Sequence, residues 1–389
     1  MDAASQTLRV DAETEEDRLQ LAPIFAPEGA DILPSARFWH DQRKLKVLGM
    51  GSALPGPPVS TAQLLARVEE RFGVAVSRRG SRLASRLKIA TRHICRDFEA
   101  RREVPRRGHS NPDLAAAALR AALDEAQLDV CDLTYLIGHT TSPACLVPPN
   151  IALVADRVGF TGPYMELRQA CTGFANALVI AQGLASIAGV KAVAIIGSET
   201  GSVYFDPQRA GEDVRQLVNL VMMGDGAAAI VVGPDDSGAG ARISGNFFGQ
   251  VGLGRSPAFT LDAGGSDQPF IKGGTLEFEH DFTAVLDSGP ELFIHGAAAA
   301  RALGTDVETV DHVIPHQANG RMAEVLGPLL GIEPKRVFVN AERLGNTGSA
   351  AVWLALAELR SSLEPGASVL ALGAEATKYM FGGFHYVHG

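Results

Sequence analysis

The chain has 389 residues, 46% of them hydrophobic and 20% charged, which are proportions of a folded globular protein with a large core. Its formal net charge of −9 argues against a surface for nucleic acid or for an anionic membrane. Four cysteines in a chain of this length do not make a disulfide framework, and this usage fits a reducing cytoplasm.

The first 44 residues carry scattered acids and three prolines without a sustained period, so we predict an irregular N-terminal extension over 1–44. Its start is acidic and polar rather than basic and then apolar, which is unlike a signal peptide. The most apolar stretch, 174–190, contains Asn176 and Gln182 and is better explained as a buried helix than as a membrane span. We therefore expect a cytoplasmic protein that is not inserted in a membrane.

From Leu45 the pattern becomes regular. An apolar run over 45–55 ends in Gly and Pro and predicts a buried strand. A basic segment with six Lys or Arg follows over 77–93. Residues 111–129 have helical spacing, with Asn111 as the expected N-cap and Pro112 in the first turn. Further strands are predicted over 133–142, 190–200 and 224–233.

Beyond residue 235 the alternation of strand and helix starts again. Strands are expected over 241–249 and 310–315, helices over 289–304 and 320–331, and closing strands over 367–389. Alternation in both halves indicates an α/β protein with mixed or parallel sheets. We therefore predict a duplicated fold with halves 45–235 and 236–389.

The stretch YMELRQACTGF places Cys171 where a predicted strand turns into a predicted helix. Unpaired N–H groups at a helix start favour a thiolate, so we expect a lowered pKa for Cys171 and a nucleophilic role. The alternative is a buried cysteine that acts as a small hydrophobic residue. Cys95, Cys131 and Cys145 lack this setting, and we expect them to be structural.

Two other strand-to-helix corners carry polar side chains. His316 lies in HVIPHQAN and Asn346 in RLGNTGS. Loops at strand ends are where α/β folds gather catalytic groups. Each residue alone would more often be structural, as a hydrogen-bonded turn histidine or a capping asparagine. Together with Cys171 they form a set able to attack an acyl carbonyl and stabilise an oxyanion.

These motifs together resemble the thiolase superfamily and, within it, the ketoacyl-acyl-carrier-protein synthase III group. The similarity is collinear from about Lys46 to the C-terminus. The matching segments are Gly49–Pro55, Ala170–Phe174, Met223–Ala229, Pro315–Arg321, Gly345–Thr347 and Gly382–Phe384. The resemblance implies a five-layered αβαβα fold with two mixed central sheets, and a homodimer.

The resemblance also implies a mechanism. Cys171 takes an acyl group from coenzyme A or an acyl carrier protein, and its N–H and that of Gly382 form an oxyanion hole. His316 and Asn346 then bind a malonyl-type extender and stabilise the enolate left by CO₂. No metal and no other cofactor is implied, and Asp225 of the GDG turn is expected to be structural.

Substrate-binding positions are implied in the same way. Arg86 and Arg321 match arginines that hold coenzyme A phosphates or the carrier's acidic face. A tryptophan that relatives place near Arg86 is Arg82 here, which favours a carrier-protein donor. Val147 matches a residue, often Phe, that gates the acyl pocket across the dimer, so a longer or wider tunnel is expected. The segment 207–219 and the extension have no clear counterpart.

Several alternatives remain open. The same acyl-cysteine could transfer its acyl group to an alcohol or amine, or lead to a resorcinol- or quinolone-type product of secondary metabolism. A non-catalytic partner subunit is a more remote possibility. A Cys-His-Asn hydrolase lacks its accompanying signatures, and GMGSALP lacks the third glycine of a dinucleotide-binding loop. His312 and His316 have no helix and no completing carboxylate for a metal site. Acyl chain, extender and carrier are not determined by the sequence.

Overall fold

In the computed structural model the described residues are 38–98, 105–235, 238–261 and 278–389. Their main feature is a sheet of ten strands. The strands from the first half are β2 (Leu45–Ala53), β5 (Tyr135–His139), β6 (Tyr164–Leu167), β7 (Val193–Glu199) and β8 (Gly226–Pro234). Those from the second half are β9 (Arg242–Gln250), β12 (His312–Pro315), β13 (Ser368–Glu375) and β14 (Met380–Val387). The order is β12-β13-β14-β9-β2-β8-β7-β5-β6, with β1 (Phe38–Asp41) beside β9.

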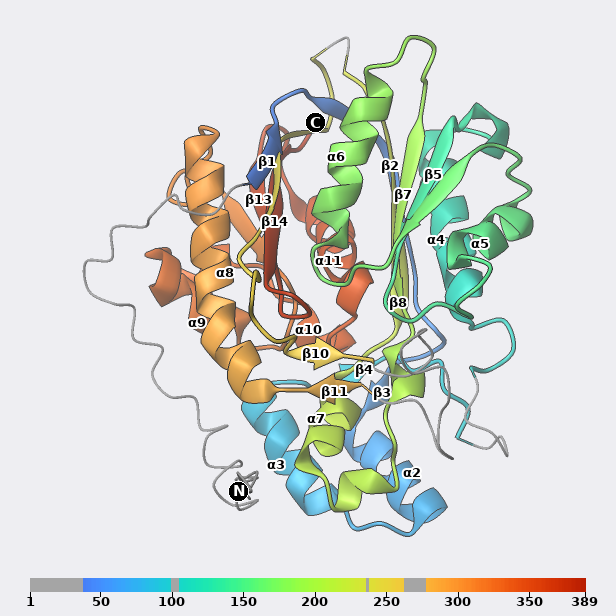
Figure 1. The fold of residues 1–389 in the computed structure, drawn as a ribbon, viewed down its shortest axis with the longest axis vertical. Helices are drawn as coiled ribbons and strands as arrows, with labels where there is room; N and C mark the ends of the chain where they lie inside the picture. Colours follow the sequence, from blue (N-terminus) through green and yellow to red (C-terminus); the bar gives the residue numbers. More distant parts are fainter. Residues whose placement is uncertain (1–37, 99–104, 236–237, 262–277) are drawn as a thin grey trace, which may run out of the picture.

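The sheet has two arms joined by a narrow seam. Strands β2 and β9 pair only at Leu45 with Ile243 and at Lys46 with Arg242. Each arm is mixed, since β5 runs parallel to β6 and β7 while β8 is antiparallel, and β12 and β13 are parallel while β14 is antiparallel. Beyond the seam the arms separate and face each other across two helices (Figure 1).

Helices fill the space between the arms and cover their outer faces. α6 (Gly173–Ala185) and α11 (Ala351–Leu359) lie in the middle, α4 (Asn111–Ala126) and α5 (Asn150–Val158) outside the first arm, and α8 (Phe282–Ala302) and α9 (Met322–Leu330) outside the second (Figure 1). Three of the buried apolar clusters correspond to these three helical layers. The predicted five-layered αβαβα fold is therefore confirmed.

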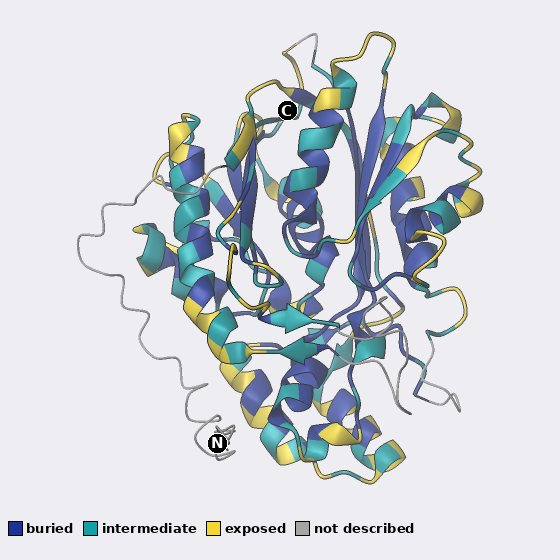
Figure 2. Ribbon diagram, viewed as in Figure 1, coloured by how far each residue is buried: buried dark blue, intermediate teal, exposed yellow. Residues whose placement is uncertain are grey.

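The central layer follows from composition. α6 and α11 are apolar around nearly their whole circumference, a pattern that only a helix buried on all sides tolerates. Phe174 of α6 makes edge contacts with Trp353 of α11 and Phe384 of β14, with ring centroids 5.8 and 5.6 Å apart. The strands on both sides are buried along most of their length (Figure 2). This rigid centre carries the start of α6, where Cys171 lies.

A fourth apolar cluster lies below the sandwich in Figure 1. It packs α2 (Thr61–Phe72), α3 (Ser77–Leu87) and α7 (Val214–Met222) against two small antiparallel sheets, β3 (Val59–Ser60) with β4 (Thr91–Arg92) and β10 (Phe259–Thr260) with β11 (Glu279–His280). The basic segment thus forms α3, and the segment 207–219 supplies most of α7. A four-residue helix, α10 (Ala341–Leu344), contacts β4.

Two local predictions differ from the structure. The N-cap of α4 is Ser110, whose side chain forms a capping box with Asp113, so Asn111 is the first helical residue rather than the cap. Phe38–Asp41, predicted as irregular, is a strand because β9 offers it a pairing edge and Phe38 packs on Phe247. Residues 1–37 of the predicted extension lie outside the described residues. No helix among the described residues is long and apolar enough to cross a membrane.

Candidate active site

A cavity of about 180 Å³ opens between the two halves of the molecule. Cys171, His316 and Asn346 all line it, although they come from three separate loops. The cavity's other polar lining residues are Thr141, Glu199, His280, Asn319, Glu375 and Thr377. Most of the remaining wall is apolar, from Leu87, Val218, Met222, Met223, Phe259, Phe278, Phe282, Val285 and Leu286. The structure therefore brings together the three residues that the sequence singled out.

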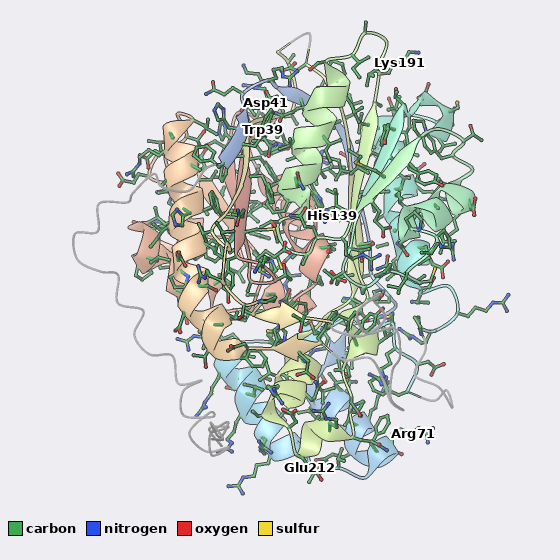
Figure 3. The ribbon with its side chains drawn as sticks, viewed as in Figure 1. Trp39, Asp41, Arg71, His139, Lys191 and Glu212 are labelled. Carbon is green, nitrogen blue, oxygen red and sulfur yellow. The ribbon has the colours of Figure 1, made fainter. Side chains whose placement is uncertain are left out.

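Cys171 lies two residues before the first residue of α6, after β6 has ended. The corner is tightly packed: a Cβ at Gly173 would lie 2.6 Å from Nδ1 of His139, so glycine is required there. His139 is buried beneath the corner and accepts a hydrogen bond from Trp353 Nε1 at 3.2 Å (Figure 3). Burial lowers the pKa of His139 to about 3, so this imidazole is neutral and supports the corner from below.

The carboxylate of Glu375, at the end of β13, binds the backbone on both sides of Cys171. It accepts hydrogen bonds from the N–H of Thr172 at 2.9 Å, the hydroxyl of Thr172 at 2.6 Å and the N–H of Ala170 at 3.3 Å. The hydroxyl of Thr377 donates a fourth. Glu375 therefore ties the second half of the chain to the nucleophile corner and occupies the N–H of Thr172, the cap residue of α6.

The predicted lowering of the Cys171 pKa is wrong. Burial, together with the nearby carboxylates of Glu375 and Glu199, raises the pKa of the Cys171 thiol well above its usual value. The N–H of Thr172, the cap residue of α6, is also bonded to the carboxylate of Glu375. Cys171 is therefore a thiol at neutral pH before substrate binds.

Glu199, at the end of β7, is a second buried carboxylate of the cavity wall. It accepts from the hydroxyls of Thr141 at 2.9 Å and Ser349 at 2.8 Å, from the N–H of Ser349 at 3.1 Å and from the hydroxyl of Ser142. Burial raises the pKa of Glu199, and these four donors work in the opposite direction. The side chain thus joins the loop after β5 to the loop after Asn346.

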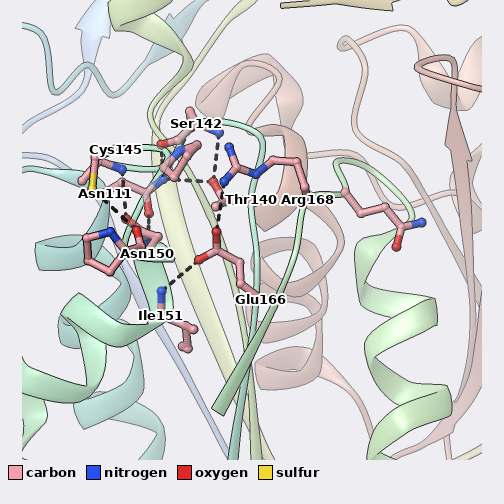
Figure 4. Close-up of polar contacts among 12 residues, drawn as sticks. Asn111, Thr140, Ser142, Cys145, Asn150, Ile151, Glu166 and Arg168 are labelled. Atoms are coloured by element: carbon pink, nitrogen blue, oxygen red, sulfur yellow. Dashed lines mark hydrogen bonds and ion pairs between the residues drawn. The ribbon is translucent and has the colours of Figure 1, made fainter. Parts of the chain in front are cut away.

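A buried network fixes the loop after β5 (Figure 4). The amide of Asn111 donates to the hydroxyl of Thr140 at 3.1 Å and to the carbonyl of Ser142 at 2.8 Å. Asn150 donates to Asn111 Oδ1 at 2.7 Å, and the N–H of Ile151 donates to Glu166 at 2.9 Å. The start of α4 therefore holds Thr141 and Ser142 in place against Glu199.

His316 follows β12, and its backbone N–H donates to the carbonyl of Leu372 at 2.7 Å. Its imidazole is buried, and Nδ1 has no hydrogen-bond partner among the described residues. Burial lowers the pKa of His316 to about 4, so the ring is neutral at physiological pH. Nδ1 is enclosed by the protein, so Nε2, for which the described residues supply no hydrogen-bond partner, is the nitrogen that can meet a substrate in the cavity.

Asn346 is held at both backbone groups. Its N–H donates to the carbonyl of Met222 at 2.8 Å, and its carbonyl accepts from the N–H of Gly224 at 3.0 Å. The N–H of Gly348 donates to Oδ1 of Asn346 at 3.0 Å, which fixes the side-chain amide. Because Oδ1 is engaged, the NH₂ group is the part of the amide that can donate into the cavity.

Comparison with known proteins gives two matches to the 3-oxoacyl-[acyl-carrier-protein] synthase III family. Its first domain profile matches residues 165–251 and its C-terminal domain profile residues 300–380. A β-ketoacyl-[acyl-carrier-protein] synthase III from Nitratidesulfovibrio vulgaris is 32% identical over 281 residues, which are 69% of this chain and 82% of the relative. This chain belongs to the synthase III family. It is accordingly an acyl-transferring condensing enzyme.

Solved structures of related enzymes have the same fold. The tetronic acid condensing enzyme AbyA1 superposes with a TM-score of 0.76 at 27% identity, covering 89% of this chain and 100% of AbyA1. The priming β-ketosynthase of the R1128 polyketide pathway gives a TM-score of 0.72 at 26% identity, covering 90% and 97%. The synthase III of Pseudomonas aeruginosa gives 0.73 at 24% identity, covering 89% and 98%.

Gly382 does not line the cavity of this synthase III family member. It lies within β14, opposite Gly373 of β13 and Phe248 of β9, and a Cβ there would meet Ala175 of α6 at 2.6 Å. The β13–β14 hairpin turns between Glu375 and Met380, so Gly382 lies two residues after the end of the turn. Residues 374–377 reach the cavity instead, and the role of Gly382 in the oxyanion hole stays a prediction.

Arg86 and Arg321 are near the cavity but not on its wall. Their segments meet, because the N–H of Gly320 donates to the carbonyl of Leu87 at 2.9 Å and Lys88 pairs with Glu324. Arg321 also pairs with Glu324, at 3.1 Å. Since Leu87 and Asn319 do line the cavity, the two arginines flank one side of it.

Val147 lies on the loop before α5, 85% exposed and away from the cavity wall. Asp225 is buried and accepts from the N–H groups of Cys95 at 2.6 Å and Ser202 at 2.9 Å, so it joins two loops as a structural residue. All four cysteines are free. Among the described residues no group of three or more His, Cys, Asp and Glu could hold a metal ion.

Sequence reasoning did not single out Glu199, His280 or Glu375. Each lies at the end of a strand, without a recognised catalytic motif around it. For Glu375 a signal existed, because an acid in an otherwise apolar strand that ends at a predicted site is unusual.

Proposed function

We propose that this enzyme condenses two acyl thioesters through a covalent acyl group on Cys171. The observation that carries the proposal is that Cys171, His316 and Asn346 open into one cavity. Cys171 comes from the half 45–235 and the other two from the half 236–389. The first half thus supplies the nucleophile, and the second half supplies the two residues that bind the extender.

In the first step the sulfur of Cys171 attacks the carbonyl carbon of an acyl thioester. The bond from that carbon to the departing sulfur breaks, and coenzyme A or a carrier protein leaves as a free thiol. Because the pKa of Cys171 is raised, its proton has to leave during the attack. The neutral imidazole of His316 is a proton acceptor in the same cavity that can pass it to the leaving sulfur.

In the second step the thioester carbonyl of a malonyl-type extender faces His316 and Asn346. Loss of CO₂ leaves an enolate, to which the imidazole N–H and the Asn346 amide donate hydrogen bonds without adding a negative charge. The enolate carbon attacks the acyl carbonyl on Cys171, and the sulfur leaves and regains a proton. The products are a 3-oxoacyl thioester, CO₂ and the free thiol of the first donor.

Substrate delivery follows from the surroundings of the cavity. Arg86 and Arg321 flank it and are placed to meet coenzyme A phosphates or the acidic face of a carrier protein. The chemistry above uses no metal or other cofactor. We also infer a cytoplasmic enzyme, because its substrates are thioesters of coenzyme A and carrier proteins.

A homodimer is supported by the edge of the first arm. β6 has one neighbouring strand among the described residues, so its other edge can pair with a second copy. Tyr164 of β6 is 42% exposed, and Leu146 and Val147 of the adjoining loop are 58% and 85% exposed. In such a dimer Val147 would gate the acyl pocket of the partner.

A product of secondary metabolism is the second candidate. AbyA1 and the R1128 enzyme, at 27% and 26% identity, are named for tetronic acid and for polyketide priming. Both names fit condensation through the same acyl-cysteine with a different second substrate. Analysis of products formed from malonyl thioesters and from other extenders distinguishes the two candidates.

The acyl-enzyme is tested by intact-mass spectrometry after incubation with acyl-coenzyme A and acyl-carrier-protein donors. We expect one acyl adduct in the wild type and none in Cys171→Ala. Cys95→Ala is not a suitable control because Cys95 is buried, whereas Cys145→Ala removes a partly exposed thiol and should keep the adduct. An adduct that persists in Cys171→Ala would overturn the proposal.

A further inference from the structure

A second histidine, His280, lines the cavity that contains Cys171 and His316. It ends β11, and its ring lies between two aromatic rings, with centroids 4.2 Å from Phe259 and 4.7 Å from Phe282. These contacts hold the plane of the imidazole within an otherwise apolar part of the wall.

The protonation of this ring is fixed by Asn219 of α7. The side-chain NH₂ of Asn219 donates to the carbonyl of Phe278 at 3.1 Å, so its Oδ1 is the atom that meets His280 Nδ1, at 2.6 Å. An amide oxygen only accepts, and therefore Nδ1 of His280 carries the proton. Burial lowers the pKa of His280 to about 3, so the ring is neutral and its Nε2 is a pure acceptor.

Nε2 of His280 has no hydrogen-bond partner among the described residues, yet it is not enclosed by them. The neighbouring lining residues Phe259, Phe282 and Leu286 offer no donor. An acceptor that faces an apolar cavity is costly unless an incoming molecule supplies an N–H or O–H group.

We propose that His280 selects thioester substrates that donate a hydrogen bond to its Nε2. This proposal rests on the proposed function, since it assumes that thioesters enter this cavity. Two sources have the required chemistry: an amide N–H of the pantetheine arm shared by coenzyme A and carrier proteins, and a hydroxyl on the acyl group. His280 then acts on specificity, while bond formation stays with Cys171, His316 and Asn346.

The first half of the experiment compares wild type with His280→Phe in acylation of Cys171, followed by intact mass. Four donors are used: butyryl- and 3-hydroxybutyryl-coenzyme A, and the S-ethyl thioesters of the same acids, which contain no amide. We expect KM to rise about 10- to 100-fold for the donors that carry the recognised group, with little change in kcat. His295→Phe, on α8 and outside the cavity, is the matched control and should change neither constant.

The donors separate the two sources. A loss in His280→Phe confined to both hydroxybutyryl donors identifies the acyl hydroxyl, and a loss confined to both coenzyme A donors identifies the pantetheine amide. Equal constants for wild type and variant with all four donors would overturn the role of His280 while leaving the acyl-enzyme intact. Absence of any adduct in the wild type would instead overturn the proposed function, and this proposal with it.

A second variant separates an effect on substrate binding from an effect on protein stability. His280→Phe leaves Oδ1 of the buried Asn219 without its donor, which destabilises the protein. The double variant His280→Phe/Asn219→Leu removes both polar groups and should melt closer to wild type. It should show the same change in KM as the single variant; a wild-type KM in the double variant would contradict the proposal.

Discussion

Two regions of the cavity wall differ in how their polar groups are paired. Around Cys171 the carboxylates of Glu199 and Glu375 each accept four hydrogen bonds from the protein. His316, which follows the neighbouring strand β12, and His280, which ends β11, each keep a ring nitrogen without a partner among the described residues. The polar groups of the first region are therefore paired within the protein, whereas those of the second region are left for a substrate to bind.

The largest effect is expected from the open region. His316→Ala and Asn346→Ala should each lower CO₂ release from a malonyl thioester by about 100- to 1000-fold, because each removes a donor to the enolate. Both variants should still acylate Cys171 from an acyl donor in excess, as seen by intact mass, although His316→Ala should do so more slowly because it lacks the proton acceptor of the first step.

His312→Ala is the control for these variants. His312 begins the same strand, β12, but does not line the cavity, so it should release CO₂ at the wild-type rate. Undiminished CO₂ release by His316→Ala and Asn346→Ala would show that neither residue acts in the decarboxylation step.

An intermediate effect is expected from the paired region. Glu375→Gln removes a negative charge beside Cys171 while keeping one carbonyl acceptor for Thr172. A carboxylate raises a thiol pKa by disfavouring the thiolate, so its loss should lower the pKa of Cys171. Alkylation by iodoacetamide, which needs the thiolate, should then begin at a lower pH and be severalfold faster at neutral pH.

The measurement is the pH dependence of alkylation at Cys171, read by peptide mass mapping because Cys131 and Cys145 are also accessible. Glu358→Gln is the matched control, since Glu358 pairs with Arg343 outside the cavity. A profile for Glu375→Gln that coincides with wild type would show that this carboxylate does not control the thiol.

The smallest effect is expected at Val147, which only a partner subunit could bring to a cavity. In a dimer, Val147→Phe should shift the preference in Cys171 acylation severalfold toward short acyl chains, because a larger side chain shortens the pocket. Ile187→Phe changes an exposed residue outside the cavity and should leave the preference unchanged.

Light scattering gives the oligomeric state of the wild type and of Val147→Phe. A monomeric wild type, or a dimer whose chain-length profile does not respond to Val147→Phe, would rule out the gate.

The sequence was sufficient for the layers and for the three central residues of the site. Strand and helix periodicity predicted the alternating elements and the two similar halves, and the resemblance to the thiolase superfamily supplied the five-layered αβαβα fold. Cys171, His316 and Asn346 were found because each lies in a local motif at the end of a strand. The start of α4 was misplaced by one residue, since Ser110 and Asn111 are both good caps and only the chain's path chooses between them.

What the tertiary structure alone decided is the electrostatic state of the site. Thr172 and Glu375 are 203 residues apart in the chain, and no local sequence pattern predicts the hydrogen bond between them. Burial of the thiol, together with the charges of Glu375 and Glu199, raises the pKa of Cys171 against the direction expected from a helix start alone. The same holds for His280, whose Nε2 is a free acceptor because Oδ1 of Asn219, far away in the chain, accepts the hydrogen bond of its Nδ1–H. Periodicity is local and records burial, whereas pairing between distant polar groups depends on how the layers are stacked.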